Sequence, residues 1–373
     1  MPDANSDTWA MFAGGGTGGH LLPGLAVAEA LVERGHDPRT IHFVGGNSGV
    51  EATLVPAAGY SLDQLPGRGI QRRLALSNVA AVVGIVRGLV RAVTIVRRRR
   101  PHVVVALGGY ASLACGLAAV LWRVPIVVLE QNARAGAANR LIGRFARAAA
   151  VSFPGTDLPR AVVTGNPLRT QIRAAAEHPD RAGARRELGL PVDRAVVVVF
   201  SGSLGSRRIN EAVLALVKTW SHRSDLAVRH VAGRRDFADV RSRVPELPEG
   251  GLVYQVIEYE DRVDLLLAAA DVAVTRAGGT VAELAAMGVP AVLVPLPIAT
   301  RDHQTANAQV LVDAGAAVIV PDAELTPERL ERELDALLAD PERTAAMAGA
   351  MKGQAHLDAA ERIAALIEQH ARG

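Results

Sequence analysis

The chain has 373 residues, which is long enough for two domains that each bury their own core. Its formal net charge is only +3, and its single cysteine, Cys115, excludes an internal disulfide and fits a reducing compartment. Hydrophobic residues make up 49 % and aromatic residues 3 %, and this Ala-, Val- and Leu-rich composition predicts alternating strands and helices. Two aspartates among the first eight residues argue against a secretory leader, so we expect a cytoplasmic protein.

The first predicted elements are a short apolar strand over residues 9–13 and a helix that begins near Leu21. Between them lies Gly14-Gly15-Gly16-Thr17-Gly18-Gly19-His20. Glycines adopt positive φ and bring bare N–H groups close to a ligand, while the helix N-terminus adds roughly half a positive charge. The turn therefore suits a phosphate, with the His20 imidazole beside it. The alternative is an ordinary tight turn in which His20 caps the helix.

Positive charge is concentrated between Gln64 and Leu129, a region that contains no carboxylate. Its ten arginines are Arg68, Arg72, Arg73, Arg87, Arg91, Arg97, Arg98, Arg99, Arg100 and Arg123. Such a region faces an anionic partner or stays highly solvated. Neither an aromatic platform nor zinc-finger spacing accompanies the charge, so we expect no nucleic acid partner. An anionic membrane surface fits better.

A long helix is predicted within this region, over residues 78–98. Its apolar positions keep a helical period: Val79, Val82, Val83, Val86, Val90 and Val93. The helix is either a solvated surface helix or an interfacial one, with apolar side chains in the headgroup region and arginines on lipid phosphates. The uncharged stretch 103–122 that follows is long enough to span a membrane. We interpret it instead as a buried strand, the loop Gly108-Gly109-Tyr110 and a small-residue helix.

The strand pattern divides the chain into two α/β units. Strands are predicted near residues 9, 41, 61, 103, 125, 148 and 161, and a second set near 195, 228, 252, 272, 291 and 317. Strands that alternate with helices predict doubly wound parallel sheets, and ligands bind such sheets at the strand C-termini, here in a cleft between two facing Rossmann-like units. The strand at 195–200 ends in a second glycine-rich turn, Ser201-Gly202-Ser203-Leu204-Gly205-Ser206-Arg207. The final helix, residues 356–370, is expected to pack back onto the first domain.

Two further segments carry candidate ligand-binding residues. A helix that begins near Thr280 has Glu283 in its first turn, where the carboxylate could accept both hydroxyls of a ribose or form a capping box with Thr280. Gln304 and Asn307, one helical turn apart, could read sugar hydroxyls or be ordinary helix-start residues. The sequence has no Asp-x-Asp pair and no HExxH motif, so we expect no catalytic metal. Helix ends and arginines such as Arg169 and Arg276 would then meet the charge of a leaving group.

At this point the motifs resemble a known family, and they run in order over most of the chain. They are Gly15-Gly16-Thr17-Gly18-Gly19-His20 with Pro23-Gly24-Leu25-Ala26, Gly108-Gly109-Tyr110, Glu130-Gln131-Asn132, Gly165-Asn166-Pro167-Leu168-Arg169, Arg276-Ala277-Gly278 with Thr280-Val281-Ala282-Glu283, and Gln304 to Asn307. The chain is identified on these motifs as a member of the MurG family of peptidoglycan N-acetylglucosaminyltransferases.

The resemblance implies a GT-B fold, with two Rossmann-like domains that face each other across a cleft. Residues 1–166 would form the acceptor- and membrane-facing domain with a returning helix at 355–373, and residues 167–354 would bind the UDP-sugar. The implied reaction is an inverting transfer, without cofactor or metal, of N-acetylglucosamine from UDP-N-acetylglucosamine to the 4-hydroxyl of undecaprenyl-linked lipid I. The product is lipid II, and the protein would be peripheral on the cytoplasmic face of the cell membrane.

Site residues are carried over position by position. His20 is our first choice of catalytic base, because an imidazole titrates near neutrality, and Glu130 is the second. The expected donor-binding residues are Thr17, Gly18, Gly19, Asn132, Arg169, Ser203, Glu260, Thr280, Glu283, Gln304 and Asn307. The expected acceptor-side residues are Gly15, Gly16, Tyr110 and Asn139.

Three departures from the family pattern leave other functions open. The usual His before Glu-Gln-Asn is Leu129, the usual Gly-Gly-Ser-Gln-Gly turn carries Leu204, and the Arg276 loop is one residue short. The alternatives are a UDP-sugar 2-epimerase of the same fold, a glycosyltransferase with another acceptor, and a non-catalytic nucleotide-binding module.

Overall fold

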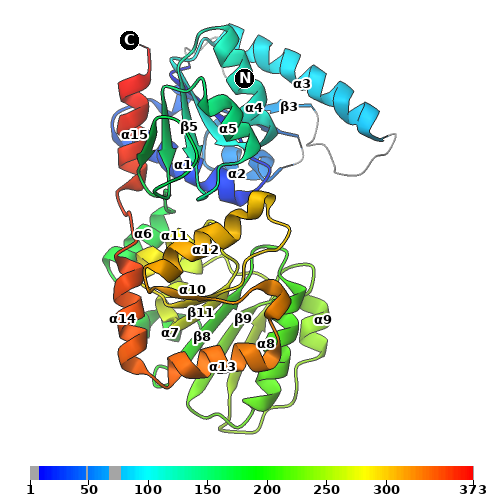
Figure 1. Cartoon of the computed structure of the whole chain (residues 1–373), viewed down its shortest axis with the longest axis vertical. Coiled ribbons are helices and arrows are strands. Elements are labelled where there is room, and N and C mark those ends of the chain that lie inside the picture. The colour runs from blue at the N-terminus through cyan, green and yellow to red at the C-terminus, as the bar shows by residue number, and fades with distance from the viewer. Residues whose placement is uncertain (1–7, 48, 67–76, 373) are drawn as a thin grey trace. The chain divides into compact units, whose positions relative to one another are not determined.

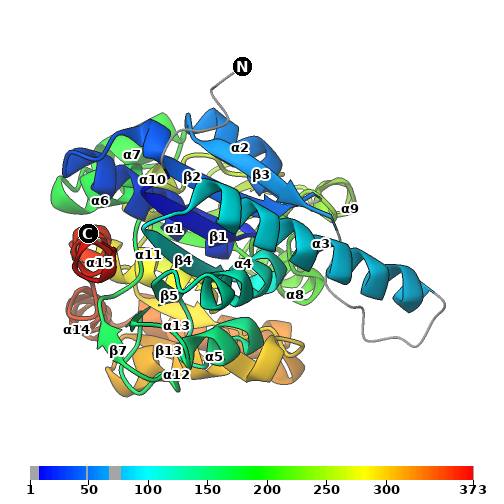
Figure 2. The same ribbon diagram turned by 90° about the horizontal axis from the view of Figure 1, so that it is seen from above.

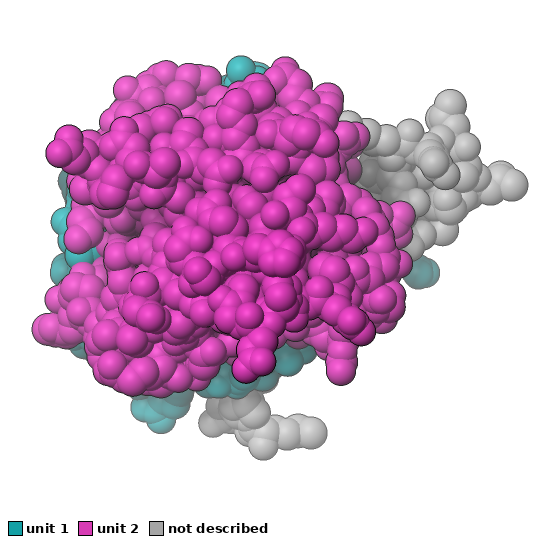
Figure 3. All heavy atoms as spheres, turned by 90° about the horizontal axis from the view of Figure 1, so that it is seen from below, with its two compact units in different colours: residues 1–169, 356–373 teal, residues 170–355 magenta. Residues whose placement is uncertain are grey.

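The structure is a computed structural model, which describes residues 8–47, 49–66 and 77–372. It forms two compact units, Met1–Arg169 with His356–Gly373, and Thr170–Ala355 (Figures 1 and 3). The sequence placed the first boundary after residue 166 and the second after residue 354. The chain therefore passes from one unit to the other twice, and unit 1 is made of two separate pieces of sequence.

Unit 1 contains a seven-stranded sheet in the order β3-β2-β1-β4-β5-β6-β7, and every strand pair is parallel. The strands are β1 (Ala10–Gly14), β2 (Ile41–Gly46), β3 (Ser61–Leu65), β4 (Val103–Gly108), β5 (Ile126–Glu130), β6 (Ala148–Val151) and β7 (Ala161–Val163). All begin close to the predicted positions. Because the sheet is covered on both faces, its middle strand β4 is apolar at every position, as the uncharged stretch 103–122 had indicated.

Helices cover the two faces of this sheet. They are α1 (Gly18–Glu33), α2 (Glu51–Ala57), α3 (Ser77–Arg99), α4 (Gly109–Leu121), α5 (Ala137–Gly143) and α15 (Ala359–His370), with the short 3₁₀ helix η1 (Pro38–Thr40). Side chains alternate between the faces along β1: Phe12 packs in the core with α1 and α15, whereas Met11 packs in the core with α3, α4 and α5. Ile363 and Ile367 of α15 are buried in the first of these cores.

Helix α3 is amphipathic in its described part and lies beside α4 (Figure 2). Ala92 and Val96 face the core, whereas Val86 and Val90 are 55 % and 62 % exposed. Arg68, Arg72 and Arg73 lie outside the described residues, and so do the side chains of Val79, Val82 and Val83. The apolar stripe of this helix therefore reaches solvent.

Unit 2 repeats the architecture with a six-stranded parallel sheet in the order β10-β9-β8-β11-β12-β13. The strands are β8 (Ala195–Phe200), β9 (Leu226–Val231), β10 (Val253–Ile257), β11 (Val272–Thr275), β12 (Ala291–Leu293) and β13 (Ala317–Ile319). The helices are α6 (Thr170–Glu177), α7 (Arg181–Glu187), α8 (Arg207–Thr219), α9 (Phe237–Ser242), α10 (Val263–Ala269), α11 (Thr280–Met287), α12 (His303–Asp313), α13 (Pro327–Leu338) and α14 (Pro341–Lys352), with 3₁₀ turns η2 (Thr300–Asp302) and η3 (Asp322–Glu324). Two doubly wound parallel sheets confirm the predicted α/β class.

Candidate active site

The β1–α1 loop is the glycine turn predicted from the sequence. Gly14, Gly15 and Gly16 have φ of +151°, +138° and +86°, values that favour glycine. Thr17 is the N-cap of α1, so His20 lies inside the first turn and is not the cap. The Thr17 hydroxyl and His20 Nδ1 are 3.1 Å apart, within hydrogen-bond distance. The loop thus presents the imidazole on the first turn of a helix.

The end of β4 makes room for that imidazole. A Cβ at Gly108, whose φ is +110°, would lie 2.9 Å from His20 Cδ2, 3.1 Å from His20 Nε2 and 3.7 Å from Asn139 Nδ2. Gly108 is therefore the point where the His20 ring from α1 and the Asn139 amide from α5 approach each other. His20 and Asn139 were both predicted, and the structure brings them together.

Glu130 ends β5 and is only 2 % exposed. Its Oε1 accepts hydrogen bonds from the backbone N–H and the side-chain amide of Asn132 (3.1 and 3.0 Å). Its Oε2 accepts from the Gly136 N–H (2.9 Å) and from Asn139 Nδ2 (3.0 Å). Both oxygens are thus engaged in shaping the β5–α5 loop. The neighbouring Gln131 amide is buried, and neither of its polar atoms has a hydrogen-bond partner among the described residues.

Tyr110 links the start of α4 to α3. Its hydroxyl donates to the carbonyl of Pro66 (3.0 Å), with those of Gly84 and Ile85 at 3.4 and 3.3 Å. Burial raises the pKa of this hydroxyl, which therefore stays protonated as a donor at neutral pH. A Cβ at Gly88 would collide with the hydroxyl, so a glycine in α3 permits the approach. The contact fixes the described N-terminal part of α3.

Sequence reasoning missed Glu51, the first residue of α2. It is 1 % exposed, and it accepts hydrogen bonds from the Gly16 N–H (Oε2, 2.9 Å) and the Gly46 N–H (Oε1, 2.8 Å). A Cβ at Gly15 would lie 2.7 Å from its Oε1. A buried carboxylate therefore lies within the glycine turn that we expected to hold a phosphate. The signal in the sequence was the cluster of glycines at 45, 46 and 49 just before an acidic residue.

In unit 2, the β8–α8 loop is a second glycine turn. Gly202 and Gly205 have φ of +85° and +79°, Ser203 is exposed, and the Ser203 carbonyl accepts from the Arg234 N–H (3.0 Å). Ser206 caps α8, and its hydroxyl also accepts from Arg276 Nη2 (2.6 Å). The turn is therefore tied to the next loop of the same sheet edge.

Arg276, at the end of β11, is held by its own unit. Its Nη1 donates to the carbonyls of Val294 and Pro295 (3.0 Å each) and lies 2.7 Å from Asp322 Oδ1. Both charged side chains are 13 % exposed. The guanidinium thus cross-links the loops after β8, β11 and β12 instead of extending into solvent. Arg169 is half-buried at the end of unit 1.

The remaining predicted donor residues lie around these loops. Thr280 is the first residue of α11, with Gly279 as N-cap, and Glu283 lies in the first turn. Gln304 Oε1 accepts from the Leu296 N–H (2.9 Å), and the buried Asn307 donates from Nδ2 to the Ala277 carbonyl (3.0 Å). Glu260 pairs with Arg229 (2.7 Å) and accepts from the Arg262 N–H (3.0 Å).

Comparisons with known proteins now bear on this geometry. The family model for the glycosyltransferase family 28 N-terminal domain matches residues 10–151, and the model for the C-terminal domain matches residues 196–363. A relative from Alkalilimnicola ehrlichii is 41 % identical over 362 residues, which cover 96 % of this chain and 98 % of the relative. The chain belongs to glycosyltransferase family 28. A family 28 relative from Nocardioides sp. is 41 % identical over 359 residues, 96 % of each chain, and both are named UDP-N-acetylglucosamine--N-acetylmuramyl-(pentapeptide) pyrophosphoryl-undecaprenol N-acetylglucosamine transferase.

A solved structure of a MurG protein agrees. The crystal structure of Acinetobacter baumannii MurG matches with a TM-score of 0.76 and 30 % identity, covering 97 % of this chain and 99 % of that one. The MurG family and the GT-B fold expected from the sequence are thus confirmed. UDP-GlcNAc 2-epimerase from Neisseria meningitidis, a structure with bound UDP-GlcNAc, matches with a TM-score of 0.67 at 14 % identity, which shows a shared fold alone.

Two of the departures from the family motifs, Leu129 and Leu204, differ in burial. Leu129 is 2 % exposed in the core on the α1 side of the unit 1 sheet, and Leu204 is 61 % exposed in the β8–α8 loop. No cluster of three or more His, Cys, Asp or Glu side chains that could hold a metal is present in the described parts of the chain. Among the described helices, none has the length and hydropathy needed to cross a membrane.

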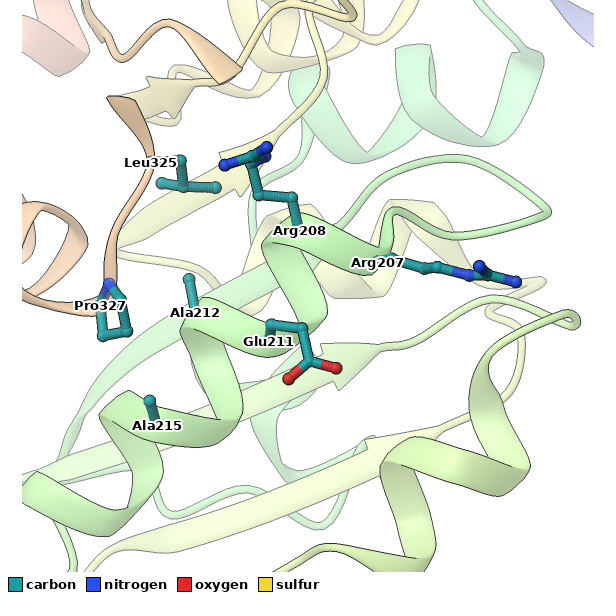
Figure 4. Close-up of a pocket in the computed structure, with 7 residues that line it drawn as sticks. All are labelled: Arg207, Arg208, Glu211, Ala212, Ala215, Leu325 and Pro327. Atoms are coloured by element: carbon teal, nitrogen blue, oxygen red, sulfur yellow. The ribbon is translucent and has the colours of Figure 1, made fainter. Parts of the chain in front are cut away.

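One groove of about 660 Å³ lies on unit 2 (Figure 4). Its lining comes from α8 and from the segment that leads into α13: Arg207, Arg208, Glu211, Ala212, Ala215, Leu325 and Pro327. Arg208 pairs with Asp322 (3.0 Å) and Glu211 with Arg243 (2.6 Å). Its charged residues are thus already paired within the unit.

Proposed function

We propose that this protein transfers N-acetylglucosamine from UDP-N-acetylglucosamine to the muramyl 4-hydroxyl of lipid I, which gives lipid II and UDP. The observation that carries the proposal is the agreement of full-length relatives: the two cited above share that one activity in their names at 41 % identity and 96 % coverage of this chain. The glycine turns, His20 and the three strand-end loops of unit 2 supply the matching chemistry. Transfer is inverting and needs no metal ion or cofactor.

His20 is the base in this proposal. When the proton resides on Nδ1, the Thr17 hydroxyl accepts it in a hydrogen bond at 3.1 Å, and Nε2, on the Gly108 side, carries the lone pair. Nε2 takes the proton of the acceptor 4-hydroxyl as that oxygen attacks the anomeric carbon. The bond from this carbon to the phosphate oxygen breaks, and UDP leaves with its electron pair.

Glu130 serves better as a positioning residue. Four N–H donors from Asn132, Gly136 and Asn139 occupy its two oxygens, so that no lone pair faces a substrate without first giving up a hydrogen bond. Its role in the proposal is to hold Asn139 beside Gly108 and so to define the acceptor side with Tyr110.

The donor is assigned to unit 2. The Thr280 N–H at the start of α11 would face the diphosphate, and Glu283, half-buried in the first turn, would accept the ribose hydroxyls. Gln304 would keep its amide N–H₂ for the sugar, since its oxygen is engaged by Leu296. Ser203 is exposed on the second glycine turn, and Asn307, Glu260 and Arg276 support these loops from within.

We further propose that unit 1 attaches to an anionic cytoplasmic membrane face. The support is a set of exposed apolar residues on, or directly after, the neighbouring helices α3, α4 and α5, with arginines beside them: Val86, Val90, Leu121, Trp122, Leu141 and Phe145. The Arg97 guanidinium lies 5.4 Å from the Trp122 ring centre, and Arg87 and Arg91 are exposed beside the valines of α3. Aromatic and aliphatic residues flanked by arginines suit lipid headgroups.

Flotation with anionic liposomes tests this attachment. The double variant Val86→Asp/Val90→Asp should stay in the soluble fraction while the unchanged protein floats, since two carboxylates oppose both insertion and anionic lipid. Val192→Asp, at a position in unit 2 that is 51 % exposed, is the matched control and should float. If all three proteins float equally, α3 does not carry the attachment.

A single assay tests the transfer itself. The protein is incubated with radiolabelled UDP-N-acetylglucosamine and a lipid I analogue, and we expect label in the lipid product. Label recovered as an isomerised nucleotide would replace the proposal with an epimerase. Tight nucleotide binding without turnover would replace it with a binding module.

A further inference from the structure

The β1–α1 turn has the backbone conformation of an anion-binding site, but the anion that it binds is a carboxylate of the protein itself. Three consecutive glycines with positive φ precede the N-terminus of α1, an arrangement that suits a phosphate. The Gly16 N–H, which would point at that phosphate, donates to Glu51 Oε2 instead (2.9 Å). The carboxylate comes from α2, which follows the next strand of the sheet.

The surroundings of Glu51 are built to accommodate this carboxylate. A Cβ at Gly15 would lie 2.7 Å from its Cδ, and a Cβ at Gly45 or Gly49 would also collide with the side chain. Two loops therefore wrap the carboxylate with glycines, and each donates one backbone N–H, from Gly16 and from Gly46. The hydrogen bonds that Glu51 accepts within the described residues come from backbone N–H groups, so backbone dipoles stabilise its charge.

We propose that Glu51 is a positioning residue for the transfer reaction: its carboxylate acts as a built-in anion that fixes the β1–α1 turn and thereby aims Thr17 and His20. This inference rests on the proposed function. A second anion next to a buried carboxylate is disfavoured, so the Gly16 N–H does not bind a substrate phosphate. The turn delivers the imidazole, and the diphosphate of the donor is bound by unit 2.

The first test compares kcat and KM of Glu51→Gln and Glu51→Ala with those of the unchanged protein in the lipid I assay. In Glu51→Gln one carboxylate oxygen becomes an NH₂ donor that faces the N–H of Gly16 or Gly46, so the turn has to shift. We expect kcat to fall on the order of 10-fold for Gln and up to about 100-fold for Ala, because an error of about 1 Å in a catalytic group costs that much. KM for UDP-N-acetylglucosamine should stay nearly constant.

Glu368→Gln is the matched control. Glu368 pairs with Arg34 at the C-terminal end of the same helix, α1, and its loss should leave kcat unchanged. Thermal unfolding of each variant is recorded, and rates are compared well below the lowest midpoint. A fall in kcat for Glu368→Gln as large as that for Glu51→Gln would reduce Glu51 to a stabiliser of α1 and overturn the inference.

A second variant acts on the carboxylate from outside the catalytic turn. Gly49→Ala places a methyl group against Glu51 Oε2 and should lower kcat as Glu51→Gln does. In the Glu51→Ala background the same methyl group meets no carboxylate, so Gly49→Ala should not lower kcat further. A general loss of stability would not produce this non-additivity. Additive effects, or wild-type kcat in Glu51→Ala, would overturn the inference alone. Failure of the unchanged protein to transfer sugar would overturn the proposed function itself.

Discussion

The strand-end loops of the two units are alike in backbone and opposite in the charge that organises them. In unit 1 the turn after β1 closes around the Glu51 carboxylate, which accepts the Gly16 and Gly46 N–H groups. In unit 2 the loops after β8, β11 and β12 close around the Arg276 guanidinium, which donates to Ser206, Val294 and Pro295. A glycine turn before a helix therefore does not define its ligand. The protein's own buried charge decides what the turn can accept.

This difference assigns the two halves of the proposed reaction. Loops organised by a cation leave their remaining N–H groups to an anionic leaving group, which suits UDP. A loop organised by an anion suits a neutral acceptor hydroxyl and a base. Arg276 and Arg208 share one carboxylate, Asp322, so the cluster keeps a net positive charge at the N-terminus of α8.

The largest expected effect comes from removing the cation of unit 2. Arg276→Met leaves Asp322, 13 % exposed, with only the half-exposed Arg208, and we expect the free energy of unfolding to fall by about 3–5 kcal/mol. Urea denaturation measures the change. Arg243→Met, which removes exposed pairs with Glu211 and Asp239, is the control and should change stability little. Equal losses for the two variants would show that Arg276 does not organise the loops.

The next effect concerns the imidazole that the first turn presents. His20→Ala should lower kcat by about 10²-fold or more, as expected for loss of a general base, while the affinity for UDP measured by calorimetry stays unchanged. Near-normal turnover would remove His20 from this role. A loss of UDP affinity would instead place the donor against the β1–α1 turn and break the contrast between the units.

The smallest expected effect is on how the free energy of unfolding depends on pH, where the buried histidines of the two units should differ. Burial lowers the pKa of His230 to about 4, and its ring is bonded to the neutral Asn210 and Tyr254. In the unfolded chain the pKa of His230 is about 6.5. Between pH 6.5 and pH 4 the unfolded chain therefore binds a proton that the folded chain does not. The free energy of unfolding falls as the pH drops, with a limiting slope of about 1.4 kcal/mol per pH unit.

His230→Gln should flatten this dependence in urea titrations at pH 7, 6 and 5. In unit 1, burial also lowers the pKa of His42, but Asp63 opposes the shift, so His42→Gln should change the slope less. A slope that His230→Gln leaves unaltered would mean that another group causes the acid sensitivity.

The fold could be read from the sequence because its signals are local. Apolar runs such as Val103-Val104-Val105 between glycine turns mark buried parallel strands wherever the partners lie, and both sheets appear where predicted. The sequence also identified the turn that holds His20 and the three loop ends of unit 2. It could not show that Gln304 and Asn307 use part of their amides on Leu296 and Ala277, because these contacts depend on tertiary packing.

Glu51 was missed for the same reason. The hydrogen bond from Gly16 to Glu51 spans 35 residues. A glycine pattern predicts the backbone conformation of the turn, but it does not predict which acceptor binds the N–H groups of that turn. Arg276 was expected to face a leaving group, and the tertiary structure places four protein acceptors around its guanidinium. Buried charged side chains that hold a loop through residues distant in the sequence are not marked by a short sequence motif.

The return of α15 to unit 1 sets an order for synthesis on the ribosome. Ile363 and Ile367 belong to the core around Phe12, so the unit that is translated first stays incomplete until the last helix emerges. Unit 2, an uninterrupted segment, can fold in the meantime, and at about 5–20 residues per second its 186 residues take roughly 10–40 seconds. During that interval the part of this core that α15 covers is exposed to chaperones, and a nascent chain that stalls before α15 would be a substrate for quality control.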